Sequence, residues 1–406
     1  MFFGNVQPTE LVRQYGSPLY VYNEETLRRR CREIRNLLTY PRFVVNYSAK
    51  ANSNLELLKI LHQEGVQVDA MSPGEIQVEL AAGFAADEIL YIGNNVSAAE
   101  MEYAIKRGVL VSVDSLSQLE MYGQLNPGGR VAVRFNPGMG AGHHEKVVTA
   151  GQKTKFGVED KQVTAVQELA KQYQLVIVGI NQHIGSLFLD GAVYLEAARA
   201  LLTIAGRFPT LEFVDFGGGF GIPYQRDSGE TRLDLESLGR RMDALLTDWA
   251  ATREHPITFK VEPGRYLVAE CGVLLGSVHS IKENYGVKYV GTDLGFNVLM
   301  RPILYDSYHE VEVYPADGET RTLRETVTVV GNICETGDII ARGRELPEIR
   351  RGDVLGVLDA GAYGYVMSSN YNNRLRPAEV LLTADGSHRL IRRRETMEDL
   401  IRTFTL

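Results

Sequence analysis

A short apolar run followed by an amphipathic stretch recurs eight times between about residue 43 and residue 262. Between the runs, stretches such as 54–65 and 190–208 carry apolar residues at every third or fourth position, which is typical of helices packed on a sheet. Eight such units over about 220 residues match the size of a (β/α)8 barrel. A doubly wound open sheet is the alternative that this pattern leaves open. The predicted strands are Phe43–Tyr47, Val66–Met71, Glu88–Ile92, Leu110–Val113, Val131–Phe135, Leu175–Ile180, Leu211–Phe216 and Ile257–Val261.

The sequence pattern changes after about residue 272. Short strand-like runs without long helices between them follow at 273–281, 287–293, 326–333 and 353–364. Residues 17–22 also read as a strand, which could join this later sheet. Because 406 residues exceed what one hydrophobic core normally supports, we expect two domains. The prediction is a barrel over 26–272 and a mainly β domain made of 1–25 and 273–406.

Composition and charge narrow the class of protein. With 44% hydrophobic and 23% charged residues, the chain has the composition of an ordinary globular protein. Its net charge of −8 argues against a nucleic-acid-binding surface, which needs a basic stripe. No window reaches the roughly 18 apolar residues of a membrane span, and residues 1–16 do not resemble a signal peptide. Three widely spaced cysteines, Cys31, Cys271 and Cys334, predict no disulfide framework, and we expect a cytoplasmic protein without nucleic-acid or membrane partners.

Polar residues close every predicted barrel strand. Structural positions in barrels favour Val, Ile and Leu, and the carboxyl ends of barrel strands carry the active sites of such enzymes. Polar residues at all eight ends therefore predict a lined pocket. They are Lys50, Asp69, Asn94, Asp114, Arg134 with Asn136, His183 with Ser186, Gly217–Gly219 and Glu262.

Lys50 follows the first predicted strand in the sequence VVNYSAKANSN. Burial at such a position favours the uncharged amine, which is nucleophilic toward an aldehyde. A lone lysine more often extends to solvent, so Lys50 gains weight only from the other polar strand ends.

Three successive glycines, Gly217–Gly219, follow the seventh predicted strand in VDFGGGFGIPY. Their N–H groups could approach a phosphate closely, although such a run can also be a simple turn. The run is not a dinucleotide fingerprint, because Ile222 stands where the last glycine of that motif would lie, and it lacks the end of a P-loop. Its neighbour along the chain is EPGR (262–265), and barrels often bind phosphate with the loops after their seventh and eighth strands.

Glu262 and His183 are further candidates for a cofactor site. A carboxylate at Glu262 could keep a pyridine nitrogen protonated and so make the ring a strong electron acceptor, or it could simply begin a helix before Pro263. His183 could stack on such a ring, although a lone histidine is more often structural. The adjacent His143 and His144 do not predict a metal site, because successive residues rarely converge on one ion.

Twelve short motifs occur together in an order that is specific to one enzyme family. They are SAKAN, DAMSPGE, GNN, VDSLS, RFNPG, KFG, HIGS, FGGGFG, EPGR, RPILY, CETGD and GAYG. On these motifs the chain resembles the alanine-racemase-type barrel family of pyridoxal-phosphate enzymes, and within it the diaminopimelate decarboxylases. The similarity extends from residue 20 to residue 381.

The resemblance implies specific roles for named residues. Lys50 would form the imine with the cofactor aldehyde, Glu262 would pair with the ring nitrogen, His183 would lie over the ring, and Cys334 would be the proton donor. The residues implied to bind pyridoxal phosphate are Lys50, Asp69, His183, Ser186, Gly218, Gly219, Glu262, Gly264, Arg265 and Tyr363. Those implied to bind substrate are Arg265, Arg301, Tyr305, Glu335 and Tyr363.

The implied reaction is decarboxylation of meso-2,6-diaminopimelate to L-lysine and CO2. The implied assembly is a homodimer with shared active sites, in which Cys334 and Glu335 come from the other subunit. Guanidinium groups suit the far carboxylate of that substrate, and a carboxylate such as Glu335 suits its far ammonium. Arg301 and Glu335 could instead form an ion pair at the dimer interface, and Cys334 could be an inert thiol.

Three departures from the family pattern bear on specificity. Leu187 stands where the family has glutamine after HIGS, Val96 stands where it often has a basic residue, and 292–297 reads TDLGFN where it often reads VDAGMN. The alternatives that remain are a related decarboxylase acting on ornithine, arginine or carboxynorspermidine, a racemase, and a catalytically inactive pyridoxal-phosphate-binding homologue.

Overall fold

The computed structural model describes residues 2–138, 141–142 and 154–405. The chain divides into two compact units. Arg28–Pro223 and Thr231–Leu267 form one of them, which we call the barrel unit. Met1–Leu27, Tyr224–Glu230 and Val268–Leu406 form the other, which we call the β unit.

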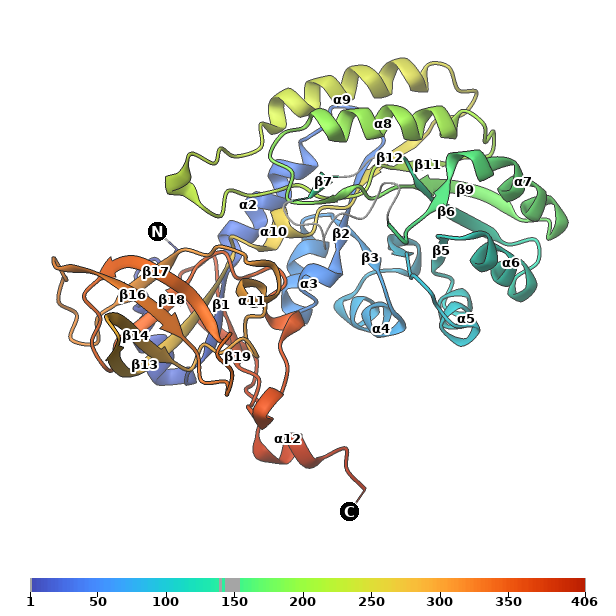
Figure 1. The fold of residues 1–406 in the computed structure, drawn as a ribbon. Coiled ribbons are helices and arrows are strands. Elements are labelled where there is room, and N and C mark those ends of the chain that lie inside the picture. Colours follow the sequence, from blue (N-terminus) through green and yellow to red (C-terminus); the bar gives the residue numbers. More distant parts are fainter. Residues whose placement is uncertain (1, 139–140, 143–153, 406) are drawn as a thin grey trace. The chain divides into compact units, whose positions relative to one another are not determined.

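A closed sheet of eight parallel strands forms the centre of the barrel unit (Figure 1). The strands are β2 (Phe43–Ser48), β3 (Gln67–Ala70), β4 (Ile89–Tyr91), β5 (Leu110–Val113), β6 (Arg130–Asn136), β9 (Val176–Asn181), β11 (Phe213–Asp215) and β12 (Thr258–Val261). Closure is explicit, because β12 pairs with β2 and β5 pairs with β6. The predicted (β/α)8 barrel is therefore confirmed, and the open-sheet alternative is wrong.

Helices cover the outer face of this sheet (Figure 1). They are α2 (Glu24–Arg35), α3 (Leu55–Gln63), α4 (Pro73–Ala82), α5 (Ala98–Lys106), α6 (Leu116–Leu125), α7 (Val163–Gln172), α8 (Ala192–Ala205), α9 (Leu235–Ala250) and the short α10 (Arg265–Val268). Local sequence fixes where several of them begin. Ser72, Ser97 and Ser115 each accept a backbone N–H three residues on and so cap α4, α5 and α6.

The interior of the barrel contains an unusual number of polar side chains. Strand register places Asn46, Asp69, Ser112, Asn181 and Asp215 on inward-facing positions, and all five are buried. Apolar residues fill the remaining interior, in a cluster of Leu90, Ile92, Ala132, Val178 and Phe213. The polar layer thus lies inside the sheet rather than on its solvent-exposed ends.

Two short pairings extend the barrel sheet. β8 (Val158–Glu159) pairs with the end of β6. β7 (Ala141–Gly142) pairs with β10 (Gly185–Ser186), which follows β9.

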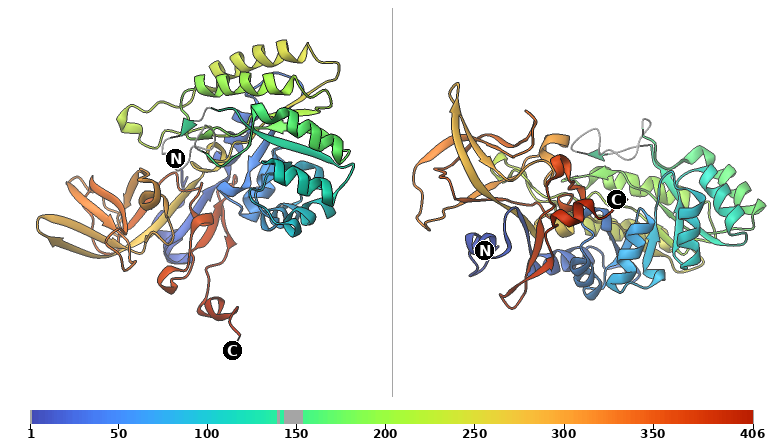
Figure 2. Two further views of the ribbon diagram at one scale, coloured as in Figure 1. Left: turned by 45° about the vertical axis from the view of Figure 1, so that its right-hand side comes forward. Right: turned by 90° about the horizontal axis from the view of Figure 1, so that it is seen from below.

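The β unit is built on a second sheet, seen from two further directions in Figure 2. Its strands are β1 (Leu19–Asn23), β13 (Gly272–Asn284), β14 (Val287–Thr292), β15 (Val311–Tyr314), β16 (Arg324–Val330), β17 (Ile339–Pro347), β18 (Val354–Val357), β19 (Ala378–Leu382) and β20 (His388–Arg392). Its α-helices are α1 (Pro8–Tyr15), α11 (Arg301–Tyr305) and α12 (Met397–Ile401).

Strand β1 lies between two strands from the opposite end of the sequence. It pairs antiparallel with β13 and parallel with β19. Leu19 and Val21 of β1 pack with Val273 and Val380 in the apolar core of this unit. The strand expected at residues 17–22 is therefore observed and belongs to the later sheet.

Candidate active site

Lys50 lies directly after β2, in a single turn of 3₁₀-helix formed by Ala49–Ala51. On the neighbouring strand β3, Asp69 is fully buried and accepts a hydrogen bond from Ser48 Oγ to its Oδ2 at 2.7 Å. Burial raises the pKa of Asp69, and the nearby Lys50 opposes that shift, which leaves the pKa at about 7. The second oxygen, Oδ1, has no hydrogen-bond partner among the described residues.

Glu262 follows β12. Strand β2 pairs with β3 along one edge and with β12 along the other. The side chain of Glu262 is buried, and no N–H group of the described residues donates to its Oε1. Burial, followed by the nearby Asp215 and Asp69, raises the pKa of Glu262 well above its usual value, while Lys50 and Arg134 act in the opposite direction. A buried carboxyl with an oxygen that accepts no hydrogen bond requires a polar partner.

The glycine run packs so closely that side chains would not fit. A Cβ on Gly218 would lie 1.9 Å from the Glu262 carbonyl oxygen, and one on Gly219 would lie 2.6 Å from that of Gly185. Gly219 also has φ +105°, a conformation that favours glycine. Gly264 is similarly close to β2, because its Cβ would lie 3.1 Å from Cβ atoms of Ser48 and Ala51. Close packing of the backbone around these three positions therefore requires glycine.

His183 lies beside this run. The N–H of Gly218 donates to His183 Nδ1 at 3.1 Å, which requires Nδ1 to be unprotonated. Burial lowers the pKa of His183 well below its usual value, and the charges of Lys50 and Arg134 add to the effect. His183 is therefore a neutral ring at neutral pH.

Ser186 and Arg265 are hydrogen-bonded to each other. Arg265 Nη2 donates to Ser186 Oγ at 2.9 Å. This hydrogen bond joins the start of α10 to the short strand β10. A hydroxyl and a guanidinium held together in this way are suited to binding the oxygens of a phosphate.

The structure thus brings nine of the predicted site residues together in the barrel unit. They are Lys50, Asp69, His183, Ser186, Gly218, Gly219, Glu262, Gly264 and Arg265. The other five belong to the β unit and are Arg301, Tyr305, Cys334, Glu335 and Tyr363.

Arg301 is the most constrained residue of the β-unit set. It begins α11, its side chain is buried, and its guanidinium lies 4.5 Å from the centre of the Tyr224 ring. Arg301 Nη1 lies 2.7 Å from His309 Nε2. Tyr305, at the end of the same helix, and Tyr363 are partly buried, and Tyr363 has φ +56°.

Cys334 and Glu335 are exposed. The Cys334 N–H donates to Asn372 Oδ1 at 3.1 Å, and Glu335 accepts a 2.5 Å hydrogen bond from the Tyr371 hydroxyl. The exposed pair Cys334–Glu335 therefore faces solvent in a single chain.

Sequence reasoning overlooked two ionisable residues near Glu262, the buried Asp215 and the partly buried Lys260. Asp215 ends β11, and Lys260 lies opposite it on β12. Strand alternation could have found both, because Asp215 lies two residues before Gly217, and Lys260 lies two residues before Glu262.

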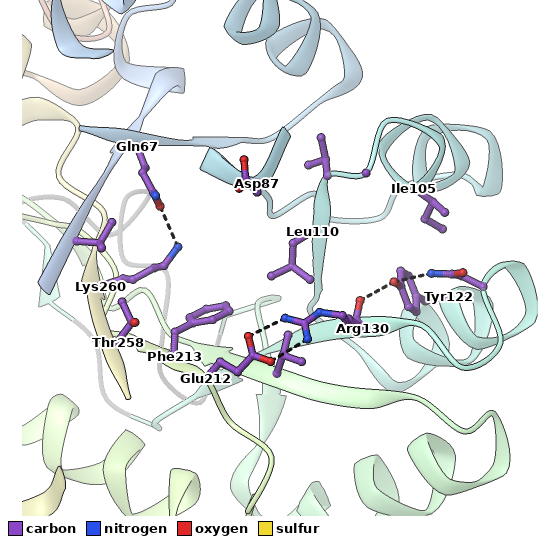
Figure 3. A pocket seen from close by; sticks show the side chains of 15 residues that line it. Gln67, Asp87, Ile105, Leu110, Tyr122, Arg130, Glu212, Phe213, Thr258 and Lys260 are labelled. Atoms are coloured by element: carbon purple, nitrogen blue, oxygen red, sulfur yellow. Dashed lines mark hydrogen bonds and ion pairs between the residues drawn. The ribbon is translucent and has the colours of Figure 1, made fainter. Parts of the chain in front are cut away.

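A cavity of about 540 Å³ lies at the other end of the barrel, where the strands begin (Figure 3). Lys260 reaches it from β12, and Figure 3 shows its amine directed at Gln67. Arg130 and Glu212 form a two-point ion pair on its wall. None of the predicted site residues lines this cavity.

The described residues contain no group of three or more His, Cys, Asp or Glu side chains arranged around a possible metal ion. Within the same residues, no helix has the length and apolar character needed to cross a membrane. His143 and His144 lie outside the described residues.

The barrel residues fit pyridoxal phosphate on three structural observations. Ser186 and Arg265 hold a hydroxyl and a guanidinium side by side, as the binding of a phosphate requires. Two buried acceptor oxygens, Asp69 Oδ1 and Glu262 Oε1, have places for a donor such as a protonated ring nitrogen. Lys50 supplies an amine at the end of β2, the strand that lies between β3, which carries Asp69, and β12, which precedes Glu262.

Comparison with known proteins agrees with this geometry. Residues 24–269 match the family model described as the pyridoxal-binding domain of pyridoxal-dependent decarboxylases. The chain is 43% identical to diaminopimelate decarboxylase of Methanothermobacter thermautotrophicus, over 99% of this chain and 95% of that protein. The chain belongs to the diaminopimelate decarboxylase family of pyridoxal-dependent decarboxylases.

Solved structures of the family share the whole fold. A crystal structure of diaminopimelate decarboxylase superposes with a TM-score of 0.92 at 35% identity, covering 99% of this chain and 98% of that one. The Helicobacter pylori enzyme, in complex with L-lysine, gives a TM-score of 0.89 at 31% identity, with 97% and 98% coverage. The family predicted from the sequence motifs is confirmed.

Proposed function

We propose that this chain is a pyridoxal-phosphate-dependent lyase that converts meso-2,6-diaminopimelate to L-lysine and CO2. The observation that carries the proposal is the placement of Lys50 and Glu262 at the carboxyl ends of adjacent barrel strands, β2 and β12. In this arrangement the Lys50 amine could bind the aldehyde of one pyridine ring while the buried Glu262 carboxyl binds the nitrogen of the same ring.

When bound, pyridoxal phosphate supplies a ring that delocalises the electrons left on a substrate carbon after CO2 departs. Lys50 would hold its aldehyde, and Glu262 would hold a proton at the ring nitrogen. His183 would lie over the ring as a neutral imidazole, so it would add no charge that competes with Glu262. Asp69 would act next to Lys50 as an acceptor fixed by the Ser48 hydroxyl.

The phosphate of the cofactor would be bound by Ser186, Gly219 and the segment 262–265. Ser186 and Arg265 are already hydrogen-bonded to each other, so few side-chain rotamers would have to be ordered on binding. Gly218, Gly264 and Tyr363 would complete the contacts with the cofactor.

The second amino-acid group of diaminopimelate carries a carboxylate and an ammonium, so its binding site needs both a positively and a negatively charged residue. Arg265, Arg301 and Tyr305 would bind its carboxylate, and Glu335 would bind its ammonium. Arg301 is suited to a fixed role, because its guanidinium is buried and lies on Tyr224. Cys334 would deliver the proton to the carbon that CO2 leaves, and Tyr363 would also contact the substrate.

The proposed active form is a homodimer in which each subunit gives Cys334 and Glu335 to the site of the other. The support is that both residues are exposed in the single chain although the proposed reaction needs them beside substrate. We propose a cytoplasmic location, in keeping with cysteines that have no sequence pattern of pairing.

The decisive experiment combines cofactor mapping with a substrate comparison. The purified protein should show a visible cofactor absorbance, and borohydride reduction followed by peptide mapping should label Lys50. Diaminopimelate should release CO2 faster than ornithine, arginine or carboxynorspermidine. Lys50→Ala should lower CO2 release by about 10³-fold or more, and Lys59→Ala, an exposed lysine of α3, should leave it unchanged.

Three outcomes would contradict the proposal. A label on another lysine would remove the site assignment, and preference for ornithine would remove the substrate. A bound cofactor without CO2 release from any of the four amino acids would favour an inactive homologue.

A further inference from the structure

Asp215 and Lys260 are neighbours beneath Glu262 inside the barrel. β11 and β12 pair in parallel with Asp215 opposite Lys260. Glu262 lies two residues beyond Lys260, so both side chains point into the barrel. Asp215 has no exposed surface, and Glu262 is buried as well. Three ionisable groups therefore share one water-poor region, where each strongly affects the others.

Asp215 is tied to the backbone of Glu262 by two successive hydrogen bonds. Its Oδ1 accepts the N–H of Gly217 at 2.9 Å, and the Gly217 carbonyl accepts the N–H of Glu262 at 2.9 Å. Gly217 has φ +73°, and a Cβ there would lie 2.1 Å from the Gln182 carbonyl oxygen. Asp215 thus helps to hold the turn at Gly217, which continues into Gly218–Gly219 and is hydrogen-bonded to the backbone of Glu262.

The carboxyls of Asp215 and Glu262 also affect each other's pKa. Burial raises the pKa of Asp215 to about 6, against the opposing effects of the Gly217 N–H, Lys260 and Glu262. For Glu262, Asp215 is the largest charged contribution that raises its pKa. The charge on Asp215 therefore adds to the effect of burial in keeping a proton on Glu262.

Lys260 is the cation that faces this carboxyl pair from the floor of the barrel. Its Nζ lies 3.2 Å from Gln67 Oε1 and 5.0 Å from the centre of the Phe213 ring (Figure 3). Burial lowers the pKa of Lys260, whereas Asp215 and Glu262 raise it. Lys260 also lines the cavity at the amino ends of the strands.

We propose that Asp215, with Lys260 as its counter-charge, is a positioning residue for Glu262. It holds the Gly217 turn and the Glu262 backbone in place, and the Asp215–Lys260 pair sets the electrostatic potential at the carboxyl that faces the ring nitrogen. The inference rests on the proposed role of Glu262 toward the cofactor. It assigns a function to two residues outside the family motifs quoted for the cofactor site.

The test uses opposite charges at two positions, because a merely structural role would not give effects of opposite sign. Asp215→Asn removes a negative charge while its amide oxygen can still accept the Gly217 N–H. It should make proton binding near Glu262 weaker and move the pH midpoint of the cofactor absorbance down by about one unit. Lys260→Met removes a positive charge and should move that midpoint up by a similar amount.

Other groups also titrate or carry charge around the pair, and they are common to all variants. They are Lys50, Asp69, Arg134, His183 and Tyr194. Differences between variants therefore report on the two substituted residues. The double variant Asp215→Asn/Lys260→Met should return the midpoint toward the wild-type value, and Lys260→Arg should leave it near that value.

Activity gives a second readout. Asp215→Asn and Lys260→Met should each lower kcat for diaminopimelate by about 10-fold or more, with KM changed by less than about 3-fold. Asp215→Ala should lose more, because the Gly217 hydrogen bond is lost as well. Glu212→Gln, which removes a carboxylate from the wall of the floor cavity, is the matched control and should change neither midpoint nor kcat.

The inference is overturned if the two single variants shift the midpoint in the same direction or not at all. Should the Asp215 variants fail to fold, Lys260→Met against Lys260→Arg still decides it. Because the absorbance titration needs no substrate, a wild-type protein that binds the cofactor but does not act on diaminopimelate would contradict the proposed function alone.

Discussion

Glu79 shows how a single buried carboxyl can lower the stability of the fold. It lies in α4 with no exposed surface, and neither carboxyl oxygen has a hydrogen-bond partner among the described residues. Burial, with smaller contributions from Glu75 and Asp69, raises the pKa of Glu79 from about 4.5 to about 9. The folded protein therefore holds this carboxyl protonated at neutral pH, whereas the unfolded chain releases the proton.

Replacing Glu79 should consequently stabilise the protein. Because the folded pKa is higher than the unfolded one, Glu79 lowers the free energy of unfolding progressively as pH rises from about 4.5 to about 9. We expect Glu79→Met to raise the free energy of unfolding by about 1–3 kcal/mol at pH 8, with a smaller gain at pH 5. Urea unfolding at the two pH values measures this, with Glu102→Met, at a partly exposed carboxylate of α5, as control. A loss of stability at pH 8 would contradict the expectation.

At the residue scale, the sequence predicts which residues lie at the ends of strands. It does not predict which residues of different strands lie next to each other inside the barrel. Lys50 and Glu262 could be predicted because each follows a clear apolar run. Alternation back from Gly217 and Glu262 could have placed Asp215 and Lys260 on the inner face, but their position opposite each other depends on the pairing of β11 with β12. The roles of Arg301 and Glu335 came from family resemblance alone.

Helix α9 packs closely against the backbone of Leu37 at Gly239, in the second turn of the helix. A Cβ on Gly239 would lie 2.1 Å from the carbonyl oxygen of Leu37, which follows α2. Leu238, Met242 and Leu246 are the buried side chains of the same helix. Close approach of this backbone is thus part of the way α9 packs.

Substitution of Gly239 should therefore reverse the usual ranking of helix residues. Helix propensity alone predicts that alanine gains about 1 kcal/mol over glycine. The contact with Leu37 predicts instead that Gly239→Ala loses about 1–3 kcal/mol, because α9 must move away. The control is Gly74→Ala in α4, where a Cβ would make only an ordinary contact, 3.6 Å from Ser72 Oγ. If urea unfolding ranked both variants above the wild type, the packing argument for α9 would be wrong.

The regular elements could be predicted, and the shortest ones could not. All eight barrel strands are observed within a few residues of their predicted bounds, because buried parallel strands carry long β-branched runs. The two-residue strands β7 and β10 leave no periodic signal of their own. The conformation of Leu187, with φ +67°, could not be foreseen either, because it depends on packing around the loop rather than on local preference.

At the scale of the whole molecule, the proposed shared active site makes activity a property of two chains. A subunit with Lys50→Ala lacks the barrel half of the proposed site, and one with Glu335→Ala lacks the half supplied to its partner. A mixed dimer then contains one doubly defective site and one intact site.

Co-expression of the two variants should therefore restore activity. With random pairing, half of the dimers are mixed and each has one intact site, so we expect about a quarter of wild-type CO2 release. Each variant expressed alone should be nearly inactive. Co-expressed variants that stay as inactive as the single ones would show that each site is built within one chain.

The position of β1 between β13 and β19 has a consequence for biosynthesis. Because translation runs from the N-terminus, Leu19–Asn23 leaves the ribosome long before Ala378–Leu382 is made. The newborn chain must therefore keep an apolar, unpaired strand in solution while hundreds of later residues are added. Barrel folding can proceed during that interval, but this strand finds its second neighbour only after the whole barrel and most of the β unit have been synthesised.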